Sequence, residues 1–552
     1  MCGLLNLILA GVLLAACSNS EVNEPSDSVR SVPSITGARI AWDHSTLQQV
    51  SDPASPSNYN GYGRIKQLQD NSLIAIYESG GSIMSRKSTD EGKTWSNTVT
   101  VAEKPPGINM AVPDLLELKD GSLLAMYNPR PHAIDPSRKF GIRIRKSYDK
   151  GITWKDEQLL YEAGYQFENG CWEPAAVQLP NGEIQLFFAN EGIYTSSSEQ
   201  NISMLRSTDN GATWSANPEI VSFRPGSRDG MPVPLLLKGK STVVFVIEDN
   251  GFTTFKPYTI RNTFSENWAS TVGASGSNRS YALKDKLNDH IYAGAPYIAQ
   301  LSTGETILSY QANATDGRTE RNSVMMVAVG DENAAGFNRI TEPFVIPVNG
   351  SGQWNSVCVL KDNSVVAVTS TRAFSASNRT EVWMIRGYII DGNTIFVGRK
   401  TNSQINASIT HDDKNLHFLA KVKDQHVIDN SDGVTFFIDA QNKSYEKPHT
   451  GIFSVSVSAL GNVAVKEGKD GNWITFSHPE VVKVVSRPAP DGYTLEVSVP
   501  WSMLGGKPGA GARMGVNLQL SETETAGQVP IKEDATGCNA NEPFSWLSEK
   551  IN

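Results

Sequence analysis

Cysteine is scarce in this chain of 552 residues, which contains five in all. Beyond the first 17 residues only Cys171, Cys358 and Cys538 remain, far apart in the sequence. An odd set of three, without a Cys-x-x-Cys motif or a Cys/His cluster, indicates neither a disulfide framework nor a zinc site. We therefore expect buried free thiols, no metal and no cofactor.

A strong charge of either sign is also lacking. The 49 Lys and Arg residues nearly balance the 58 Asp and Glu residues, the net charge is −9, and no basic stripe runs along the sequence. This composition argues against nucleic acid and against an anionic membrane surface as partners. It is compatible with a neutral ligand. The length predicts two domains, one large and one smaller.

Long apolar runs are lacking except at the N-terminus, where residues 1–17 end in Leu14-Ala-Ala-Cys17. This run is too short to span a bilayer and is typical of a secretory signal. Its end resembles the lipobox of bacterial lipoproteins. The resemblance implies lipidation of Cys17, anchoring by acyl chains alone, and a place in the bacterial outer membrane, facing the periplasm or the cell surface. An ordinary signal peptide is the alternative. Residues 18–37, rich in Ser, Pro, Glu and Asn, predict a flexible tether.

One eight-residue motif, S-x-D-x-G-x-T-W, occurs three times, starting at Ser88, Ser147 and Ser207. Spacings of 59 and 60 residues indicate an array of similar supersecondary units. Asp and Gly supply turn chemistry, and the Trp is suited to fill the space between neighbouring sheets. The motif resembles the Asp-box, or BNR repeat, of sialidases and other propeller glycosidases, in which it is structural. Counting strands places it at the turn between the third and fourth strands of each unit.

A second repeat consists of an apolar strand, a turn of Asp, Asn or Gly type, and another apolar strand. It occurs six times, at residues 64–79, 113–129, 173–191, 231–249, 295–312 and 354–372. If each copy opens a four-stranded blade, residues 38–395 close a six-bladed β-propeller.

Aligning the six copies gives two columns of residues at the starts of the first strands. The first column is Tyr62, Val112, Glu173, Met231, Ala295 and Trp354, and the second is Arg64, Asp114, Ala175, Val233, Tyr297 and Ser356. Side chains two residues apart share a strand face. Both columns are therefore predicted to project toward a central funnel.

Residues 396–552 contain strands without the blade pattern and predict a smaller β-sandwich, so that the whole fold is all-β. The spacing and the amino-acid sequence of these strands resemble the family 9 carbohydrate-binding module. Trp473 and Trp546 are candidates for stacking on a sugar, whereas Trp501 is typical of a core residue. His411-Asp412-Asp413 could be a metal site, but a solvated turn is the favoured interpretation of this segment.

Hydrolysis of a glycosidic bond needs two carboxyl groups at one site. Glu173 begins the first strand of the third hairpin, and Glu248 ends the second strand of the fourth. In antiparallel hairpins these two positions lie at the same rim, so both carboxyls are predicted to face one mouth of the propeller. Glu168, Glu191 and Asp249 are rival carboxylates nearby.

Around these two residues the chain resembles the family 93 glycoside hydrolases, which are exo-acting α-1,5-L-arabinanases with a six-bladed fold. The resemblance is sharpest at Trp172-Glu173-Pro174 and at Arg228-Asp-Gly-Met-Pro232, which is followed by Glu248. It implies a retaining mechanism with Glu173 as general acid/base and Glu248 as nucleophile. The chain departs from the family at the turn Lys238-Gly-Lys240 and in the β-branched strand before Glu248, so the substrate could differ while the chemistry is kept.

Five further residues are candidates for binding the sugar: Arg64, Asp114, Trp172, Arg228 and Tyr297. Arg64 and Arg228 are equally compatible with internal salt bridges. The interpretation favoured by the sequence is an exo-acting retaining glycoside hydrolase on plant-type polysaccharide, with α-1,5-L-arabinan as the expected substrate and the C-terminal module as an added carbohydrate-binding domain.

Two alternatives remain open. An exo-α-sialidase is suggested by the Asp-boxes and by Arg64, but it needs three convergent arginines and a Tyr paired with a Glu. Arg261 and Arg372 would have to reach the funnel to complete such a triad. The other alternative is a non-catalytic glycan-binding lipoprotein of the cell surface, because a fold alone does not determine a reaction.

Overall fold

The computed structural model describes residues 39–550, apart from 315–316, 391–393, 398–402, 429, 444, 511, 536–537 and 544–545. The predicted signal segment, Cys17 and the tether lie outside the described residues. The described part is built of β-strands with three short 3₁₀ turns, η2 (Phe167–Asn169), η3 (Glu320–Asn322) and η4 (Pro479–Val481). None of its helical segments is long and apolar enough to cross a membrane.

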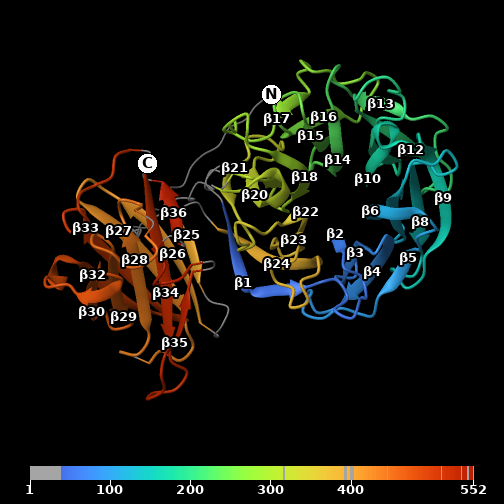
Figure 1. The fold of residues 1–552 in the computed structure, drawn as a ribbon. Coiled ribbons are helices and arrows are strands. Elements are labelled where there is room, and N and C mark those ends of the chain that lie inside the picture. The colour runs from blue at the N-terminus through green and yellow to red at the C-terminus, as the bar shows by residue number, and fades with distance from the viewer. Residues whose placement is uncertain are drawn as a thin grey trace, which may run out of the picture. The chain divides into compact units, whose positions relative to one another are not determined.

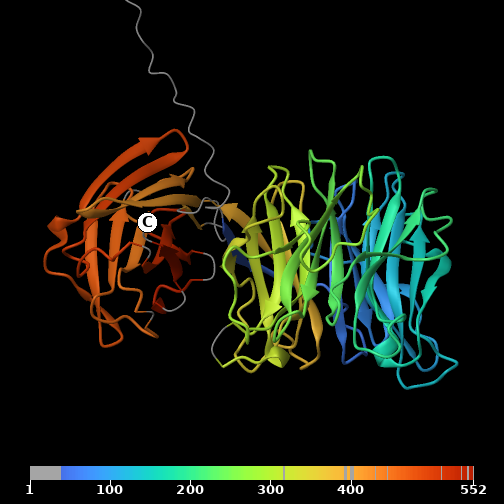
Figure 2. The same cartoon turned by 90° about the horizontal axis from the view of Figure 1, so that it is seen from above.

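Six antiparallel sheets of four strands surround a common axis (Figures 1 and 2). The innermost strands are β2 (Asn60–Gln67), β6 (Ile108–Glu117), β10 (Cys171–Gln178), β14 (Asp229–Leu236), β18 (Ala293–Gln300) and β22 (Gln353–Val359). The second strands are β3 (Leu73–Ser79), β7 (Leu123–Pro131), β11 (Ile184–Asn190), β15 (Thr242–Asp249), β19 (Thr306–Ala312) and β23 (Val365–Thr371). The third strands are β4 (Ser82–Ser88), β8 (Gly141–Ser147), β12 (Asn201–Ser207), β16 (Lys256–Thr263), β20 (Val324–Gly330) and β24 (Glu381–Ile390). The outermost strands are β5 (Val99–Ala102), β9 (Lys155–Glu162), β13 (Glu219–Ser222), β17 (Arg279–Tyr281), β21 (Asn338–Thr341) and β1 (Arg39–Gln49).

The burial of the second strands explains why the hairpin repeat could be recognised in the sequence. Each has neighbouring blades against both faces, and in β11, β19 and β23 every residue is buried. A strand covered on both sides is a continuous apolar run instead of an alternating one. The prediction of an all-β fold with a six-bladed propeller is confirmed.

The propeller is closed into a ring by pairing between strands from its two ends. β1 pairs with β24, from Arg39 opposite Ile390 to Gln49 opposite Trp383. The first strand of the described residues, β1, is therefore the outermost strand of the sixth blade. Closing the circle with a strand from the other end of the propeller ties the first and last blades together by backbone hydrogen bonds.

Each innermost strand carries a β-bulge near its start. In β10 the pairing passes from Trp172 opposite Ala189 to Ala175 opposite Phe187, so Glu173 and Pro174 together oppose one residue. The same register shift occurs in the other five blades. The first bulged residue has a φ between 46° and 57° in all six cases: Tyr62, Val112, Glu173, Met231, Ala295 and Trp354. Non-glycine residues rarely adopt this left-handed conformation, and a bulge re-aims the side chain that it carries.

The Asp-boxes lie between the third and fourth strands of blades one to three, as predicted. In each box the Ser hydroxyl accepts a hydrogen bond from the Gly backbone N–H at 2.8 Å, as Ser147 does from Gly151. The Asp carboxylate in turn accepts hydrogen bonds from the Thr backbone and hydroxyl. The Trp154 indole of blade two donates to Ser85 Oγ of blade one at 3.3 Å. The second box thus joins blades one and two at the rim away from the starts of the innermost strands.

The C-terminal domain is a β-sandwich of two antiparallel sheets, as predicted. One sheet consists of β25 (Thr394–Val397), β26 (Gln404–His411), β27 (Asn415–Lys423), β33 (Gly492–Pro500) and β32 (Lys483–Ala489). The other consists of β31 (Asn472–Thr475), β30 (Val463–Lys469), β29 (Phe453–Ser458), β28 (Gly433–Asp439), β34 (Arg513–Glu522), β35 (Ile531–Asp534) and β36 (Leu547–Lys550). Since β25 pairs with β26, this sheet begins two residues before the boundary expected at residue 396. Burial alternates along β27, which is typical of a sheet with one face in the core.

Candidate active site

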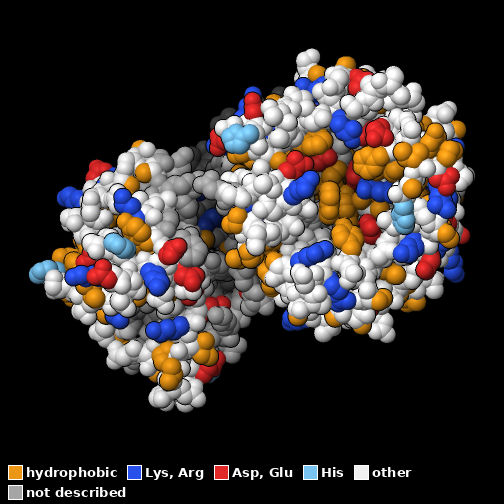
Figure 3. All heavy atoms as spheres, in the orientation of Figure 1, with side chains coloured by type: hydrophobic (Ala, Val, Ile, Leu, Met, Phe, Trp, Pro, Cys, Tyr) orange, Lys and Arg blue, Asp and Glu red, His pale blue; other side chains and the backbone are white. Residues whose placement is uncertain are grey.

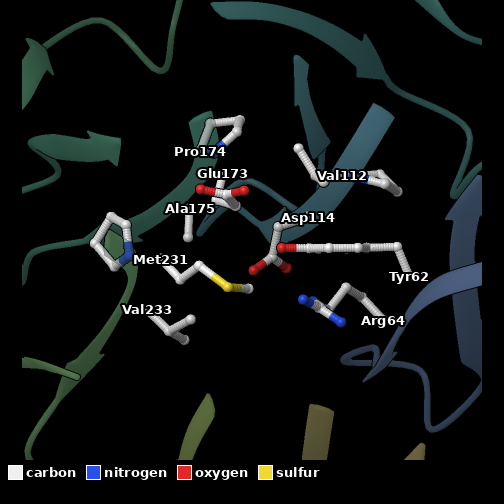
Figure 4. Close-up of a pocket in the computed structure, with 11 residues that line it drawn as sticks. Tyr62, Arg64, Val112, Asp114, Glu173, Pro174, Ala175, Met231 and Val233 are labelled. Carbon is white, nitrogen blue, oxygen red and sulfur yellow. The ribbon is translucent and has the colours of Figure 1, made fainter. Parts of the chain in front are cut away.

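A pocket opens at the centre of the propeller, at the starts of the innermost strands (Figure 4). It is lined by Tyr62, Arg64, Val112, Pro113, Asp114, Glu173, Pro174, Ala175, Met231, Pro232 and Val233. Members of both predicted columns therefore face this pocket. The space-filling view shows a hollow at the middle of the propeller, where hydrophobic side chains lie beside acidic and basic ones (Figure 3).

Glu173 is the only charged residue among the six at the bulges. Its Oε1 lies 2.9 Å from Nη2 of Arg130, which comes from the end of β7 in the neighbouring blade. The Arg130 guanidinium also covers the Trp172 ring, 4.8 Å from the ring centroid. Burial raises the pKa of Glu173, and the positive charge of Arg130 acts in the opposite direction. The carboxyl is therefore oriented by a cation and can hold a proton above the usual range of a glutamate.

Glu248, at the end of β15, is fixed by the backbone around it. Its Oε2 accepts a hydrogen bond from the Ala295 N–H at 2.8 Å. A Cβ added at Gly230 would lie 3.0 Å from Oε1, and one at Gly294 would lie 2.7 Å from Oε2, so both glycines leave room for the carboxyl. Burial raises the pKa of Glu248 to about 7, against the hydrogen bond from Ala295, and the charge of Glu173 adds to the rise.

The bracing of Glu248 has counterparts in other blades. Gln311 Oε1 accepts from the Trp354 N–H at 2.8 Å, and Ser370 Oγ accepts from the Tyr62 N–H at 2.9 Å. Oε2 of Glu248 therefore makes a hydrogen bond that recurs around the ring: a side chain at the end of a second strand accepts from the N–H of the bulged residue in the next blade. Among the described residues no hydrogen-bond donor reaches its other oxygen, Oε1, which stays available for chemistry.

The two carboxyls act on each other at the same mouth. Glu173 raises the pKa of Glu248, and the two residues come from adjacent blades, at a strand start and a strand end. The negative charge of Glu173 therefore favours the protonated form of Glu248. Hydrolysis of a glycosidic bond requires two carboxyl groups at one site.

Two of the predicted sugar-binding residues, Asp114 and Tyr297, form one network with Lys66. The Tyr297 hydroxyl donates to both oxygens of Asp114 at 3.2 Å, and the Lys66 ammonium donates to the Tyr297 hydroxyl at 2.9 Å. These residues come from blades five, two and one, so the network crosses the central channel. It gives the pocket a polar floor.

Arg64 lies over two aromatic rings, with its guanidinium carbon 4.3 Å from the ring centroid of Tyr62 and 5.0 Å from that of Tyr297. Its Nη1 donates to the carbonyls of Gly63 and Trp354, each at 3.0 Å. The sequence left two roles open for Arg64, sugar binding or an internal salt bridge. In the structure Arg64 lines the pocket, and backbone carbonyls and aromatic rings hold its guanidinium in place.

Arg228 and Trp172 lie beside the pocket but do not line it. Arg228 forms an ion pair with Glu191, which agrees with the salt-bridge interpretation. Trp172 is buried against Phe140 and Phe167, with ring centroids 4.9 and 4.7 Å away. It supports Arg130 instead of presenting a face to a sugar.

The structure also places residues at the mouth that the sequence analysis did not select. Arg130, Lys66 and the hydroxyl of Tyr62 belong to this group, as does Glu78, whose pKa burial raises to about 7. Glu78 lies opposite Gly61, the register position that Glu248 occupies opposite Gly230. An alignment of the second strands, in addition to the first, would have found it.

Two of the three rival carboxylates, Asp249 and Glu191, have other partners, and Glu168 lies exposed in η2. Asp249 is fully buried in ion pairs with Arg224, at 2.8 Å, and with Arg279. Glu191 forms an ion pair with Arg228. Arg261 lies on the third strand of blade four and Arg372 on an exposed loop, where they donate to Thr259 and Thr380. Neither of these two arginines lines the pocket.

One group of acidic residues in the sandwich has the geometry of a cation site. Carboxylate oxygens of Asp424, Asp432 and Glu522 lie within 4.8 Å of one another, and all three residues are buried. Asp424 Oδ2 and Glu522 Oε2 have no hydrogen-bond partner among the described residues. By contrast, Asp412 bonds to His417 at 3.1 Å and Asp413 to Lys507 at 2.9 Å, as expected of a solvated turn.

The two aromatic candidates of the sandwich belong to one cluster. The rings of Trp473 and Trp546 are parallel, with an interplanar angle of 4° and centroids 6.5 Å apart, and both pack against Phe437. Trp546 is buried, whereas Trp473 is partly exposed. Trp473 is therefore the member that can offer a face to a sugar.

Comparison with protein families gives two matches. Residues 137–384 match the BNR repeat-like domain, and residues 388–547 match the carbohydrate family 9 binding domain-like family. The chain thus carries the BNR-type propeller and the family 9-type module that its sequence resembles. No curated protein sequence matches the chain.

Solved structures similar to the chain include two fungal enzymes and a bacterial module. A mutant α-L-arabinofuranosidase from Fusarium graminearum, bound to an iminosugar inhibitor, is 15% identical over 64% of this chain and 98% of its own, with a TM-score of 0.49. The α-L-arabinanase of Penicillium chrysogenum, complexed with arabinobiose, is 19% identical over 63% of this chain and 98% of its own, with a TM-score of 0.45. A family 9 carbohydrate-binding module from Caldicellulosiruptor kristjanssonii, in complex with cellotriose, is 18% identical over 29% of this chain and 81% of its own, with a TM-score of 0.25.

Proposed function

We propose that the protein is an exo-acting, retaining glycoside hydrolase whose substrate is α-1,5-L-arabinan. The observation that carries the proposal is the pair of half-buried carboxyls, Glu173 and Glu248, at one mouth of the propeller, where the charge of Glu173 raises the pKa of Glu248. A retaining glycosidase uses one carboxyl as acid and then base, and the other as the nucleophile that forms a covalent glycosyl-enzyme.

The roles of the two carboxyls follow from their segments. Trp172-Glu173-Pro174 resembles the acid/base segment of family 93, and the segment that ends at Glu248 resembles its nucleophile segment. In the first step Glu173 protonates the leaving oxygen while Glu248 attacks the anomeric carbon. In the second step Glu173 removes a proton from water, which releases the sugar from Glu248. Arg130 orients Glu173, and the Ala295 N–H orients Glu248.

The pocket floor supports an exo mode of action. Because Lys66, Tyr297 and Asp114 are linked across the channel, a polysaccharide cannot pass through it. A pocket closed below accepts the end of a chain, not its middle. The lining combines apolar surface from Met231 and Val233 with a few polar groups, a composition typical of small-molecule sites.

A sialidase is the second candidate, because Arg64, Arg130 and Arg228 all lower the pKa of Glu173 and so surround the site with positive charge. Arg130 is paired with Glu173 and Arg228 with Glu191, however. Of these three arginines, Arg64 alone has no carboxylate partner among the described residues, whereas a sialoside clamp needs three free arginines. We therefore keep the sialoside as a control substrate.

The family 9-type module would hold polysaccharide close to the active site, which raises the effective substrate concentration without adding chemistry. The lipobox-like segment at Cys17 supports the further proposal that the enzyme is an outer-membrane lipoprotein. Mass spectrometry of the mature N-terminus tests this: an acylated Cys17 is expected, and an unmodified N-terminus at another residue would refute it.

The deciding experiment measures release of arabinose or arabinobiose from linear α-1,5-arabinan by the wild type, Glu173→Gln and Glu248→Gln, with a sialoside in parallel. We expect product from arabinan only, and a loss of at least a hundredfold in each variant. Undiminished activity in either variant would refute the role of that residue. Activity on the sialoside alone would favour the second candidate.

A further inference from the structure

The ring of Tyr62 is fixed on three sides at the edge of the pocket. Its backbone is held at the bulge with a φ of 57°, and its N–H donates to Ser370 Oγ at 2.9 Å. The ring stacks on Trp354, with centroids 5.6 Å apart and an interplanar angle of 23°. The Arg64 guanidinium covers the ring at 4.3 Å. A side chain so constrained can direct its hydroxyl in one direction only.

The Tyr62 hydroxyl is buried and has no hydrogen-bond partner among the described residues. Figure 4 shows that it points into the pocket, toward the space between Asp114 and Glu173. Two other buried tyrosines behave as expected: Tyr127 donates to Glu157 at 2.9 Å, and Tyr297 donates to Asp114. An unpaired buried hydroxyl destabilises a fold, so each one calls for an explanation.

The charges around Tyr62 keep the hydroxyl in its neutral form. Burial raises its pKa well above the usual range, and the negative charges of Glu173 and Glu248 raise it further, against Arg64 and Arg130. A neutral phenol is a hydrogen-bond donor, not a nucleophile. Figure 4 shows the Tyr62 side chain in the same pocket as the Glu173 carboxyl.

We propose that Tyr62 is a catalytic residue whose hydroxyl donates a hydrogen bond to a hydroxyl oxygen of the terminal sugar, beside the anomeric carbon. The inference rests on the proposed function, because it places that carbon between Glu173 and Glu248. The sugar oxygen supplies the acceptor that the folded protein does not. Hydrogen bonds of this kind to a sugar hydroxyl strengthen as the transition state forms.

The test compares Tyr62→Phe with Tyr127→Phe as the matched control. Both variants keep the ring and remove one buried hydroxyl. For Tyr62→Phe we expect kcat/KM on arabino-oligosaccharides to fall about 10- to 100-fold, while the melting temperature stays the same or rises, since an unpaired group has been removed. For Tyr127→Phe we expect a lower melting temperature and an unchanged kcat/KM. A kcat/KM of Tyr62→Phe within twofold of the wild type would overturn the inference.

A binding measurement separates this inference from the proposed function. Calorimetric titration of arabinobiose into Glu248→Gln, with and without Tyr62→Phe, should show at least a fivefold weaker affinity in the double variant. Equal affinities, together with inactive Glu173→Gln and Glu248→Gln, would overturn the role of Tyr62 and leave the proposed function standing. A wild type that neither hydrolyses nor binds arabinan fragments would overturn both.

Discussion

Nη2 of Arg130 lies 2.9 Å from Oε1 of Glu173, and this ion pair joins the second and third blades at the mouth of the propeller. Both side chains are partly exposed, at 27% for Arg130 and 19% for Glu173. Burial and Arg130 therefore act on the pKa of Glu173 in opposite directions. A general acid works best when its pKa lies near the working pH, and this balance sets that pKa.

Replacing Arg130 by Met is expected to shift the pH dependence of activity. Without the cation the pKa of Glu173 rises, because burial is no longer opposed. The limb of the kcat/KM profile on which the acid loses its proton should move to higher pH by about one unit. Arg143→Met is the control, since Arg143 pairs with Glu157 at 3.1 Å, on the third strand of its blade. An unshifted limb in Arg130→Met would show that Glu173 is not the acid.

Much of the fold was predictable because the propeller repeats its sequence signals. Buried second strands are short apolar runs, and the turns between them carry Asp, Asn or Gly, so six hairpins could be counted. The closing strand could not be predicted in this way. β1 pairs with β24, across more than 330 residues, and nothing local in residues 39–49 specifies that partner.

The bulges left a sequence signal that the prediction did not use. Pro113, Pro174, Pro232 and Pro296 each follow a bulged residue with positive φ. Proline has no N–H for the ladder and is confined to such places within a sheet. Four prolines at equivalent positions of first strands therefore mark the bulges. They explain how residues at one strand start can all face the funnel.

The site was predictable in part. Glu173 and Glu248 could be selected as candidates because both lie at the rim positions of recognisable hairpins. Arg130 was missed because it lies beyond the aligned part of its hairpin, and its role depends on a contact with the next blade. Tyr62 was aligned correctly, but its importance arises from an unpaired hydroxyl, which only the packing reveals.

The two carboxyls proposed as catalytic, Glu173 and Glu248, should respond differently to the leaving group. Glu173→Ala removes the proton donor, so it should lose about 100- to 10,000-fold on arabinan, yet retain most of the first step on a dinitrophenyl arabinoside. Glu248→Ala should be inactive on both substrates, because the nucleophile itself is gone. Burst kinetics with the activated substrate measure the two steps separately. The reverse pattern would exchange the assigned roles.

The Asp-boxes should affect stability and leave catalysis unchanged. Ser147→Ala leaves the buried Gly151 N–H without its acceptor, which costs about 1–3 kcal/mol and should lower the melting temperature by several degrees. Ser137→Ala is the control, because Ser137 bonds to Asp135 on an exposed turn. A kcat/KM that fell in Ser147→Ala at temperatures where the variant is folded would contradict a purely architectural role.

Trp473 should carry polysaccharide binding by the sandwich. It is the partly exposed member of the Trp473, Trp546 and Phe437 cluster, and its indole N–H donates to Asn541 at 3.1 Å. Trp473→Ala should reduce binding of the full chain to insoluble polysaccharide by at least tenfold, with kcat on soluble oligosaccharides unchanged. Ile474→Ala, at the next position of β31, should bind as the wild type does. Full retention of binding in Trp473→Ala would assign the sugar to another face.

The acidic trio of the sandwich predicts a stability that depends on pH and on cations. Burial raises the pKa of Glu522 to about 7, and Asp424, Asp432 and Glu524 add to the rise, while Ser403 opposes it. Burial likewise raises the pKa of Asp432. A carboxyl whose pKa is higher in the folded state stabilises the fold below the pKa of the unfolded chain, and this contribution is lost as pH rises through the folded value.

The melting temperature of the sandwich should therefore fall between pH 5 and pH 8 in the presence of EDTA. Millimolar Ca²⁺ should restore it at pH 8 and have little effect at pH 5, because oxygen ligands must be ionised to bind the metal. Calorimetry of the full chain measures this, and the sandwich transition is identified as the one that Asp424→Asn shifts. That variant should also lose the response to Ca²⁺, since it removes one of the three charges. A melting temperature at pH 8 that ignores both Ca²⁺ and EDTA would mean that the three carboxyls keep a shared proton and bind no cation.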